Sequence, residues 1–389
     1  MRIDVLTSLY PAPERPFEGI FAERRWRAMA ARGHEVRVVA PVPWLPRPLH
    51  GLAGAARAEA ARAPRREERS GVAVERPRFL HVPAMPVGNA RRFARAGAAA
   101  ITPAADVVVC DYAWPAAAIA PRLAAAGRRV VVNGRGSDVL QVRGVAGLRG
   151  PLQAGLRAAH GLTAVSQDLL DAMVALAGPQ GTRVTALTPN GVDADRFGPG
   201  DPAGARQRLG LERTGRVVLV VGHLIERKDP LLALGAFAAS DPAPGDRLVL
   251  VGRGPLEEAV RARADELDLG AHVTLAGERP PEELVDWYRA ADALLLTSSR
   301  EGRPNVVLEA LSCGLPVLAT DAGGTSELLR DARMLARTRD PEALGGMLRV
   351  LLDDRPSADD LRRSVAHLTW DASLDALTAV LEAVAALPR

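Results

Sequence analysis

Short apolar runs alternate with longer helical segments along most of the chain, and this alternation constrains the fold more than any other feature. In the first half the apolar runs lie at 3–7, 36–40, 106–110, 130–133 and 162–165. In the second half they lie at 217–221, 248–251, 273–275, 293–297 and 316–319. The segments between them with helical character include 22–31, 116–125, 168–176, 231–239, 257–267, 282–289 and 306–312. This order predicts a doubly wound α/β architecture, in which crossover helices join parallel strands.

The length of 389 residues predicts two domains of similar size, because a single hydrophobic core rarely grows beyond roughly 250–300 residues. Segment 189–204 is the best candidate for a linker, since its Pro, Gly and Asp content disfavours regular structure. We therefore expect one Rossmann-like domain at residues 1–188 and another at 189–369. The amphipathic segment 370–389 is expected to pack back on the first domain.

Residues 46–77 depart from the alternation. They are rich in Ala, Arg and Pro and show no clear period. This segment therefore predicts a long, partly helical and mobile excursion from the first domain.

The overall composition is that of a soluble globular protein. Hydrophobic residues make up 48% of the chain and charged residues 25%, and no apolar run reaches the roughly 18 residues that would span a bilayer. The chain enters a strand directly and shows no leader-type apolar segment, which predicts a cytoplasmic location. The two cysteines, Cys110 and Cys313, are expected to be buried thiols and to form neither a disulfide nor a metal site.

Charge is divided unequally between the two halves of the chain. Residues 1–190 hold 26 Arg and 14 acidic residues, a net charge of +12, and the remainder carries −8. The basic half predicts an anionic partner, either a glycan or the inner face of the plasma membrane as a peripheral contact. General solubility is an alternative reason for the charge. Nucleic acid is disfavoured, because the basic residues occur without aromatic interleaving or a nucleic-acid motif.

Two glutamates eight positions apart, Glu301 and Glu309, mark the strongest candidate site. An apolar strand end at 293–297 precedes them, a turn at 302–304 follows the strand, and Asn305 is expected to cap the next helix. Eight residues correspond to about 2.2 helical turns, so Glu301 is expected just before the helix and Glu309 on its second turn. The free N–H groups at a helix start suit hydroxyl or phosphate oxygens. This pattern predicts a nucleotide-sugar site, with one carboxylate on a sugar and the other on a ribose.

Lys228 is the single lysine among 50 basic residues, the other 49 being arginine. It follows the apolar strand 217–221 in the sequence VGHLIERKDP. A compact ammonium at this place suits a contact that a planar guanidinium does not make. A solvated loop lysine without function is the alternative.

Several familiar motifs are absent from the sequence. The turn after the first strand has no GxGxxG, which disfavours a dehydrogenase-type dinucleotide site, and neither GxxxxGK[ST] nor GxSxG occurs. Asp193 and Asp195 form an Asp-x-Asp pair that could hold a metal on a diphosphate, but they lie in the expected linker. We therefore expect no bound metal and no cofactor.

Five ordered motifs carry a resemblance to a known family. They are EGRPNVVLE, VGHLIERKDP, PNGVDADRF, VVGRGPLEE and NGRGSD. The chain resembles a family 4 retaining glycosyltransferase of GT-B fold, and the resemblance extends from the first strand to the last helix. The N-terminal phrases YPAPERPFEGIFAERR, PVPWLP and RGSD are most similar to teichuronic-acid-type glycosyltransferases. The resemblance implies two Rossmann-like domains that face each other across a cleft.

The resemblance also implies roles for residues of the second domain. Glu301 would hydrogen-bond the donor sugar, Glu309 would bind the ribose, and Lys228 would neutralise the diphosphate. The sugar hydroxyls and phosphate oxygens would be held by the backbone of Gly302, Arg303, Pro304, Asn305 and Val306. Family members commonly have arginine where this chain has His223, so His223 would bond phosphate as a neutral donor, or Arg227 or Arg253 would substitute for the missing cation.

In the first domain, Gly19 matches a loop glycine that lets the backbone approach the donor phosphates. Arg135 opens the RGSD turn where many relatives carry histidine, and either an acceptor contact or structural pairing with Asp138 would explain it. Asp138 itself matches the family and is expected to line the cleft.

The expected activity is retaining transfer of a sugar from a nucleoside-diphosphate sugar to a hydroxyl of a glycan or a lipid-linked acceptor, in cell-surface polysaccharide synthesis. Lys228 and Glu301 are the expected catalytic residues, and no metal is required. Two alternatives come from other classes. One is a catalytically silent sugar-nucleotide-binding or scaffold protein of GT-B fold, and the other is a GT-B epimerase.

Overall fold

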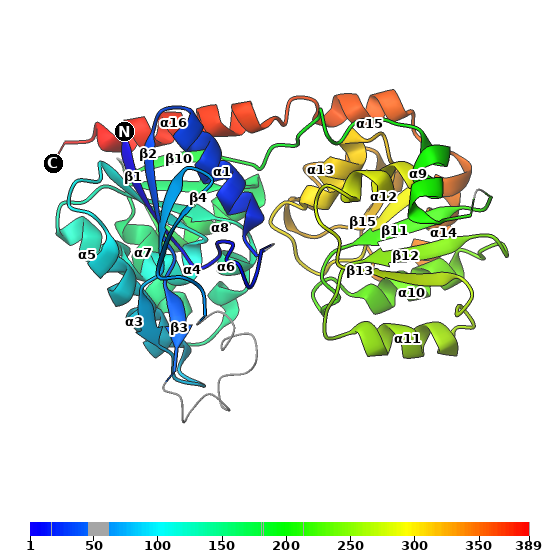
Figure 1. Cartoon of the computed structure of the whole chain (residues 1–389), viewed down its shortest axis with the longest axis horizontal. Helices are drawn as coiled ribbons and strands as arrows, with labels where there is room; N and C mark the ends of the chain where they lie inside the picture. Colours follow the sequence, from blue (N-terminus) through cyan, green and yellow to red (C-terminus); the bar gives the residue numbers. More distant parts are fainter. Residues whose placement is uncertain (17, 46–61, 180, 182, 213, 389) are drawn as a thin grey trace. The chain divides into compact units, whose positions relative to one another are not determined.

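The structure is a computed structural model that describes residues 1–389 except 17, 46–61, 180, 182, 213 and 389. It divides into two compact units (Figure 1). Unit 1 consists of Met1–Pro189 with Asp371–Arg389, and unit 2 consists of Asn190–Trp370. Both are α/β units built on a mainly parallel sheet, so the predicted fold class is confirmed for each.

Unit 1 contains a sheet with the strand order β10-β9-β8-β7-β1-β2-β5-β4. Its strands are β1 (Arg2–Thr7), β2 (Glu35–Val39), β4 (Arg66–Arg69), β5 (Val72–Glu75), β7 (Val107–Asp111), β8 (Val130–Gly134), β9 (Gly161–Ala164) and β10 (Val184–Leu187). All pairs are parallel except β4 with β5. Every residue of β7 and β8 is buried, and each strand begins with an apolar run, at 107–110 and 130–132, before a buried polar residue near its carboxyl end. A separate parallel ribbon pairs β3 (Val42–Trp44) with β6 (Arg78–Leu80).

Helices cover both faces of this sheet (Figure 1). One face carries α1 (Ile20–Ala31) and the last helix, α16 (Trp370–Ala385), whose apolar side chains share a core with Ile3 and Val5. The opposite face carries α3 (Pro86–Ala100), α4 (Ala113–Ala116), α5 (Ala120–Ala125), α7 (Arg149–Ala158) and α8 (Gln167–Ala177). The short helix α6 (Ser137–Leu140) follows β8. The C-terminal segment of the chain is therefore part of the core of unit 1.

The irregular excursion expected at 46–77 is wrong for its second part, and residues 46–61 lie outside the described residues. Strands β4 and β5 form an antiparallel hairpin within this segment, and β5 joins the sheet beside β2. The two-residue turn is Ser70-Gly71, with φ of 52° and 77°. Two positive φ values are typical of the type I′ turn that matches the twist of a hairpin. The strands were missed because each is only four residues long, too short for a period to stand out.

Unit 2 contains a fully parallel sheet with the order β13-β12-β11-β14-β15-β16. The strands are β11 (Val217–Val221), β12 (Arg247–Val251), β13 (Val273–Gly277), β14 (Ala293–Leu296), β15 (Val317–Thr320) and β16 (Leu335–Ala336). Chain order along the sheet is therefore 3-2-1-4-5-6, the order of the doubly wound nucleotide-binding fold. The order reverses between β11 and β14.

The helices of unit 2 pack in two groups. One group contains α10 (Pro230–Ala239), α11 (Glu257–Glu266) and α14 (Pro341–Asp353). The other contains α9 (Pro202–Leu209), α12 (Leu284–Ala290), α13 (Asn305–Ser312) and α15 (Ala358–Val365). The expected linker 189–204 lies mostly in unit 2, where Val192 pairs with Thr369 in a parallel bridge. The buried state expected for Cys110 and Cys313 is confirmed. Among the described residues, no helix has both the length and the hydropathy needed to cross a membrane.

Candidate functional site

Lys228 and Glu301 come together at the carboxyl ends of two neighbouring strands of unit 2. Lys228 lies in the loop after β11, and Glu301 lies in the loop after β14, which pairs with β11 in parallel. Ligands of open α/β sheets bind outside the carboxyl ends of the strands where the strand order reverses. This pair of loops therefore occupies the place in unit 2 where the fold favours a ligand.

Glu301 is the electrostatic centre of this site. Lys228 Nζ lies 2.5 Å from Glu301 Oε1, and Arg227 Nη1 lies 3.3 Å from Oε2. Glu301 is only 8% exposed. Burial alone would raise the pKa of Glu301, but the positive charges of Lys228 and Arg227 outweigh burial and hold this pKa below its ordinary value. Glu301 is therefore a fixed carboxylate with a cation on each oxygen.

Hydrogen bonds fix the two loops to each other. Thr297 Oγ1 donates to the carbonyl oxygens of Lys228 at 3.0 Å and Asp229 at 2.8 Å. The Ser299 N–H donates to the Arg227 carbonyl at 2.8 Å. Asp229 in turn caps α10 by accepting from the Leu232 N–H at 3.1 Å. The position of the Lys228 backbone is thus set by the segment after β14 that leads to Glu301.

A third loop, which follows β15, packs against the backbone of Glu301. A Cβ on Gly323 would lie 2.0 Å from the Glu301 carbonyl oxygen, so only glycine fits there. The Gly324 N–H donates to the Gly302 carbonyl at 3.1 Å. The sequence reasoning gave residues 321–325 no role. The available signal was the DAGG turn directly after an apolar strand.

The helix α13 starts at Asn305, and its N-cap residue is Pro304, so the prediction that Asn305 is the cap is wrong. Pro304 has no N–H to satisfy and its φ of −76° is extended. The side chain of Asn305 instead accepts a hydrogen bond from Asn190 Nδ2 at 3.0 Å. The Val307 N–H donates to the Pro304 carbonyl at 3.2 Å, which leaves the Asn305 and Val306 N–H groups at the start of α13 to bind an anion.

Glu309 lies on the second turn of α13, as the spacing predicts. Its Oε2 accepts a hydrogen bond from the Tyr288 hydroxyl at 2.8 Å. Burial and the neighbouring Glu309 carboxylate raise the pKa of Tyr288, so the phenol stays protonated and donates. The structure thus gives Glu309 a partner that the sequence reasoning did not identify.

The remaining predicted donor-side residues differ in exposure. His223 and Arg253 are exposed, while Arg303 is partly buried. Burial lowers the pKa of Arg303, although Glu327 counteracts this shift. Arg227, one candidate substitute for the missing cation at His223, contacts Glu301. Within the described residues, no three His, Cys, Asp or Glu side chains are grouped as metal ligands.

In unit 1 the Arg135 guanidinium pairs with Asp111, so of the two alternatives for Arg135 the side-chain pairing with Asp138 is wrong. The acceptor contact stays a prediction. Arg135 Nη2 lies 2.9 Å from Asp111 Oδ2, and Nε donates to Oδ1 at 3.0 Å. The side chains are 4% and 1% exposed. The Arg135 guanidinium also stacks on the Phe21 ring at 4.8 Å. Arg135 is therefore a buried bidentate partner, a geometry that lysine does not provide.

Asp111 lies at the carboxyl end of β7 and accepts further hydrogen bonds. Trp26 Nε1 donates to it at 2.7 Å and Asn133 Nδ2 at 2.6 Å. Burial alone would raise the pKa of Asp111, but Arg135, Arg25 and Asn133 lower it to about 2. Burial, with repulsion from Arg135, lowers the pKa of Arg25 to about 9. The sequence reasoning missed this network, since Asp111 lies outside the quoted motifs and Arg25, the last residue of YPAPERPFEGIFAERR, was given no role.

Asp138 is 2% exposed, and its carboxylate binds the backbone of the RGSD turn to which it belongs. Its carboxylate accepts hydrogen bonds from the backbone N–H groups of Ala113, Arg135 and Gly136. Burial raises the pKa of Asp138 to about 6, although these N–H groups counteract the shift. The geometry gives Asp138 a positioning role for the two loops after β7 and β8.

Gly19 precedes α1 with a φ of 77°, a left-handed conformation that favours glycine. A Cβ at this position would lie 2.6 Å from the Leu9 carbonyl carbon. Both observations require glycine, because the loop after β1 approaches the start of α1 closely.

Comparison with known families accounts for both units. The model of Glycosyltransferase Family 4 matches residues 22–196, and the model of Glycosyl transferases group 1 matches residues 204–367. The chain belongs to the family 4 glycosyltransferases. The ordered motifs EGRPNVVLE and VGHLIERKDP fall in the second matched region, and NGRGSD falls in the first.

Two curated relatives illustrate the family. A D-inositol 3-phosphate glycosyltransferase of Acidothermus cellulolyticus is 36% identical over 54% of this chain and 50% of its own length. The aligned part thus spans about half the length of this relative. The putative teichuronic acid biosynthesis glycosyltransferase TuaC of Bacillus subtilis is 28% identical over 88% of this chain and 87% of its own length. The expected resemblance to a teichuronic-acid-type enzyme is confirmed.

Solved structures show the same fold at low sequence identity. A sucrose-phosphate synthase from Thermosynechococcus elongatus is similar with a TM-score of 0.80 and 21% identity over 98% of each chain. The Anabaena protein HepE in complex with UDP-glucose is similar with a TM-score of 0.71 and 19% identity over 100% of each chain. The matches to the family models and to these solved structures confirm the predicted GT-B fold.

Proposed function

We propose that this family 4 protein transfers a sugar from a nucleoside-diphosphate sugar to a hydroxyl of a glycan or lipid-linked acceptor, with retention of configuration. The observation that carries the proposal is the Lys228–Glu301 pair at the strand-order reversal of unit 2, 2.5 Å apart and next to the start of α13. UDP-glucose in the complex of the similar HepE structure supports a nucleotide-sugar donor.

The geometry of this pair suits a diphosphate next to a sugar. An ammonium has three N–H donors, and one of them is directed at Glu301, so two remain for phosphate oxygens. Glu301 stays ionised and accepts hydrogen bonds from sugar hydroxyls. The N–H groups at the start of α13 add a partial positive charge for the phosphates. Lys228 and α13 together would stabilise the negative charge that develops on the leaving nucleoside diphosphate, without a metal ion.

Retention requires that the acceptor hydroxyl enters on the face from which the diphosphate leaves. The leaving phosphate oxygen can then take the acceptor proton, so this route needs no general base from the protein. A double displacement would need a carboxylate nucleophile close to the reacting carbon. Both oxygens of Glu301 already face cations, which favours a binding role for this carboxylate over a nucleophilic one.

Release of nucleotide from UDP-, GDP- and ADP-sugars, with and without glycan acceptors, tests the proposal. We expect release that depends on the acceptor, and a product with the anomeric configuration of the donor. A catalytically silent binding protein would bind a nucleotide sugar without release. A GT-B epimerase would release nucleotide or convert the sugar without any acceptor. Either of these results would replace the proposal.

The two glutamates of the site are expected to differ in their kinetic effects. Glu309, the proposed ribose ligand, contributes to binding in the ground state and in the transition state alike. We expect Glu309→Gln to raise the donor KM more than it lowers kcat, and Glu301→Gln to lower kcat at least as much as it raises KM. Steady-state kinetics with the active donor checks this. Identical profiles for the two variants would show that the roles are misassigned.

Peripheral contact with an anionic membrane is a further part of the proposal, carried by the charge of +12 on residues 1–190. Five of these basic residues, Arg57, Arg62, Arg65, Arg66 and Arg69, are clustered within segment 46–77, and Arg57 lies outside the described residues. Arg66 pairs with Glu75 and Arg69 with Glu23, so two of these charges already have a partner within unit 1. Arg62 and Arg65 are exposed. We expect Arg62→Ser/Arg65→Ser to reduce sedimentation with anionic vesicles about twofold or more, since each basic residue near the surface contributes about 1 kcal/mol. Equal sedimentation with neutral and anionic vesicles would contradict membrane recruitment by charge.

A further inference from the structure

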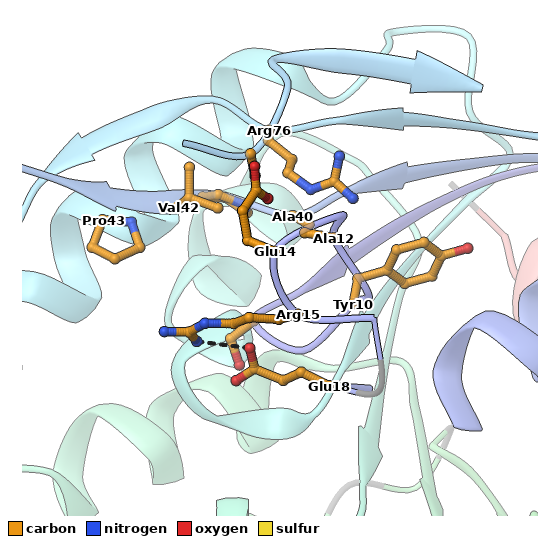
Figure 2. A pocket seen from close by; sticks show the side chains of 12 residues that line it. Tyr10, Ala12, Glu14, Arg15, Glu18, Ala40, Val42, Pro43 and Arg76 are labelled. Atoms are coloured by element: carbon orange, nitrogen blue, oxygen red, sulfur yellow. Dashed lines mark hydrogen bonds and ion pairs between the residues drawn. The ribbon is translucent and has the colours of Figure 1, made fainter. Parts of the chain in front are cut away.

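A cavity of about 110 Å³ lies in unit 1, where the loop after β1 meets the segment after β2 (Figure 2). One water needs about 10–15 Å³ by the same measure, so the cavity has room for a small ring compound. Its wall includes Glu14, Arg15, Glu18, Val42, Pro43 and Arg76. None of these residues belongs to the donor site described above.

A tight turn places Glu14 at this cavity. Ala12 and Arg15 pair through both of their backbone groups, at 3.2 Å and 2.8 Å, so Pro13 and Glu14 form the tip of the turn. Figure 2 shows the Glu14 side chain projecting from this loop, apart from the Arg15–Glu18 pair. The turn thus fixes the backbone that presents the Glu14 carboxylate.

The cations of the wall have partners in the protein. Arg15 Nη1 donates to Glu18 Oε2 at 2.7 Å. Arg76 is 1% exposed, and its Nη2 donates to the Pro11 carbonyl at 2.6 Å and to Glu67 Oε1 at 2.7 Å. Each guanidinium is therefore held by a carboxylate, and the two pairs are neutral overall.

Glu14 differs from the two arginines because one of its side-chain oxygens has no hydrogen-bond partner among the described residues. Its Oε2 is buried and accepts no hydrogen bond from any residue that the structure describes. The charge of Arg78 acts on Glu14, but Arg78 donates hydrogen bonds to the carbonyl oxygens of Ala63 and Arg76. A buried acceptor without a donor is costly, and a ligand hydroxyl would satisfy it.

We propose that this cavity holds a neutral, hydroxyl-rich ring, a hexose or cyclitol unit of the acceptor, and that Glu14 selects this ring against its phosphorylated form. The inference rests on the proposed function, since it names the acceptor class. Hydroxyl groups donate to the Glu14 carboxylate, while Val42 and Pro43 provide an apolar wall for a ring face. A phosphate on the ring would meet the Glu14 carboxylate, whose Oε2 has no hydrogen-bond donor in the part of the chain that the structure describes, and such like-charge contacts are unfavourable.

Two matched ligand pairs test the selection without any donor sugar. They are myo-inositol with D-inositol 3-phosphate, and methyl glucoside with its 6-phosphate. Ligand-observed NMR gives the dissociation constant of each compound. For each pair, the Kd of the phosphorylated ring is divided by the Kd of the neutral ring. For at least one pair we expect the parent protein to bind the neutral ring about tenfold more tightly or better, which corresponds to about 1.4 kcal/mol. Glu14→Gln keeps the size of the side chain but removes its charge, and it is expected to lower this ratio at least about threefold by the same relation.

Glu68→Gln is the matched control, because Glu68 is an exposed acid of the same unit that lies outside the cavity. It is expected to leave the ratio unchanged. Equal or tighter binding of the phosphorylated ring by the parent, an unchanged ratio in Glu14→Gln, or no binding of either neutral ring would each overturn the inference. Nucleotide release reports on the proposed function separately, so a failure of this selection is distinguishable from a failure of sugar transfer.

Discussion

Lys228→Ala is expected to lower sugar transfer by about 30-fold to several thousand-fold. Truncating one partner of a buried, hydrogen-bonded charge pair typically costs about 2–5 kcal/mol, and Lys228 would also lose its contact with the donor diphosphate. The fold should survive, because Arg227 remains 3.3 Å from Glu301 and still compensates its charge. Calorimetry with the donor nucleotide and initial rates of transfer measure the two effects.

Arg300→Ala is the matched control for this experiment. Arg300 carries the same charge and lies in the same loop as Glu301, but its side chain is exposed. It is expected to change donor affinity by less than about twofold, as exposed charges contribute little. Donor affinity of Lys228→Ala within threefold of the parent protein would remove Lys228 from the diphosphate site.

Arg135→Ala is expected to lower the free energy of unfolding of unit 1 by about 3–5 kcal/mol, because it removes the bidentate ion-pair partner of the buried Asp111 carboxylate. The loss should depend on pH. The pKa of Asp111 in the folded parent is about 2, so the stabilisation is present above about pH 4, the ordinary Asp value, and is lost as the pH falls toward 2. The difference in free energy of unfolding between parent and variant should therefore become smaller as the pH falls from about 4 to about 2. Urea unfolding, combined with hydrogen exchange of the β7 and β8 amides, measures it.

Two variants separate this structural role from contact with the acceptor. Arg143→Ala removes an exposed arginine from the same unit and should leave stability within about 0.5 kcal/mol of the parent. Asp111→Asn/Arg135→Met removes both charges and should lose less stability than Arg135→Ala, since it leaves no buried carboxylate without its ion-pair partner. Reduced turnover of Arg135→Ala with unchanged stability would instead indicate direct contact with the acceptor.

Features that depend on local sequence could be predicted well. The apolar runs of the parallel strands gave the α/β class of both units, because strands buried on both faces leave continuous hydrophobic segments. The spacing of Glu301 and Glu309 placed them before and on one helix, because helical geometry fixes the positions of nearby residues. The observed start of α13 at Asn305 is one residue earlier than the predicted start, since Pro304, which has no N–H to satisfy, takes the N-cap position.

Contacts between distant segments could not be predicted from the sequence. Lys228 and Glu301 are 73 residues apart, and they meet only because β11 and β14 are neighbours in the sheet. Arg135 could equally have paired with Asp138, three residues away, but the backbone N–H groups of the RGSD turn occupy that carboxylate. Asp111, which takes its place, lies 24 residues from Arg135 and is reached across the parallel pair β7–β8.

Crystals soaked with UDP, GDP or ADP give the most direct test of the donor site. We expect difference density for the diphosphate within hydrogen-bonding distance of Lys228 Nζ and the start of α13, with the ribose at the Glu309 carboxylate. Soaked crystals of Lys228→Ala should show weaker density or none. Nucleotide bound elsewhere, with Lys228 still paired only to Glu301, would show that the loops after β11 and β14 do not hold the donor.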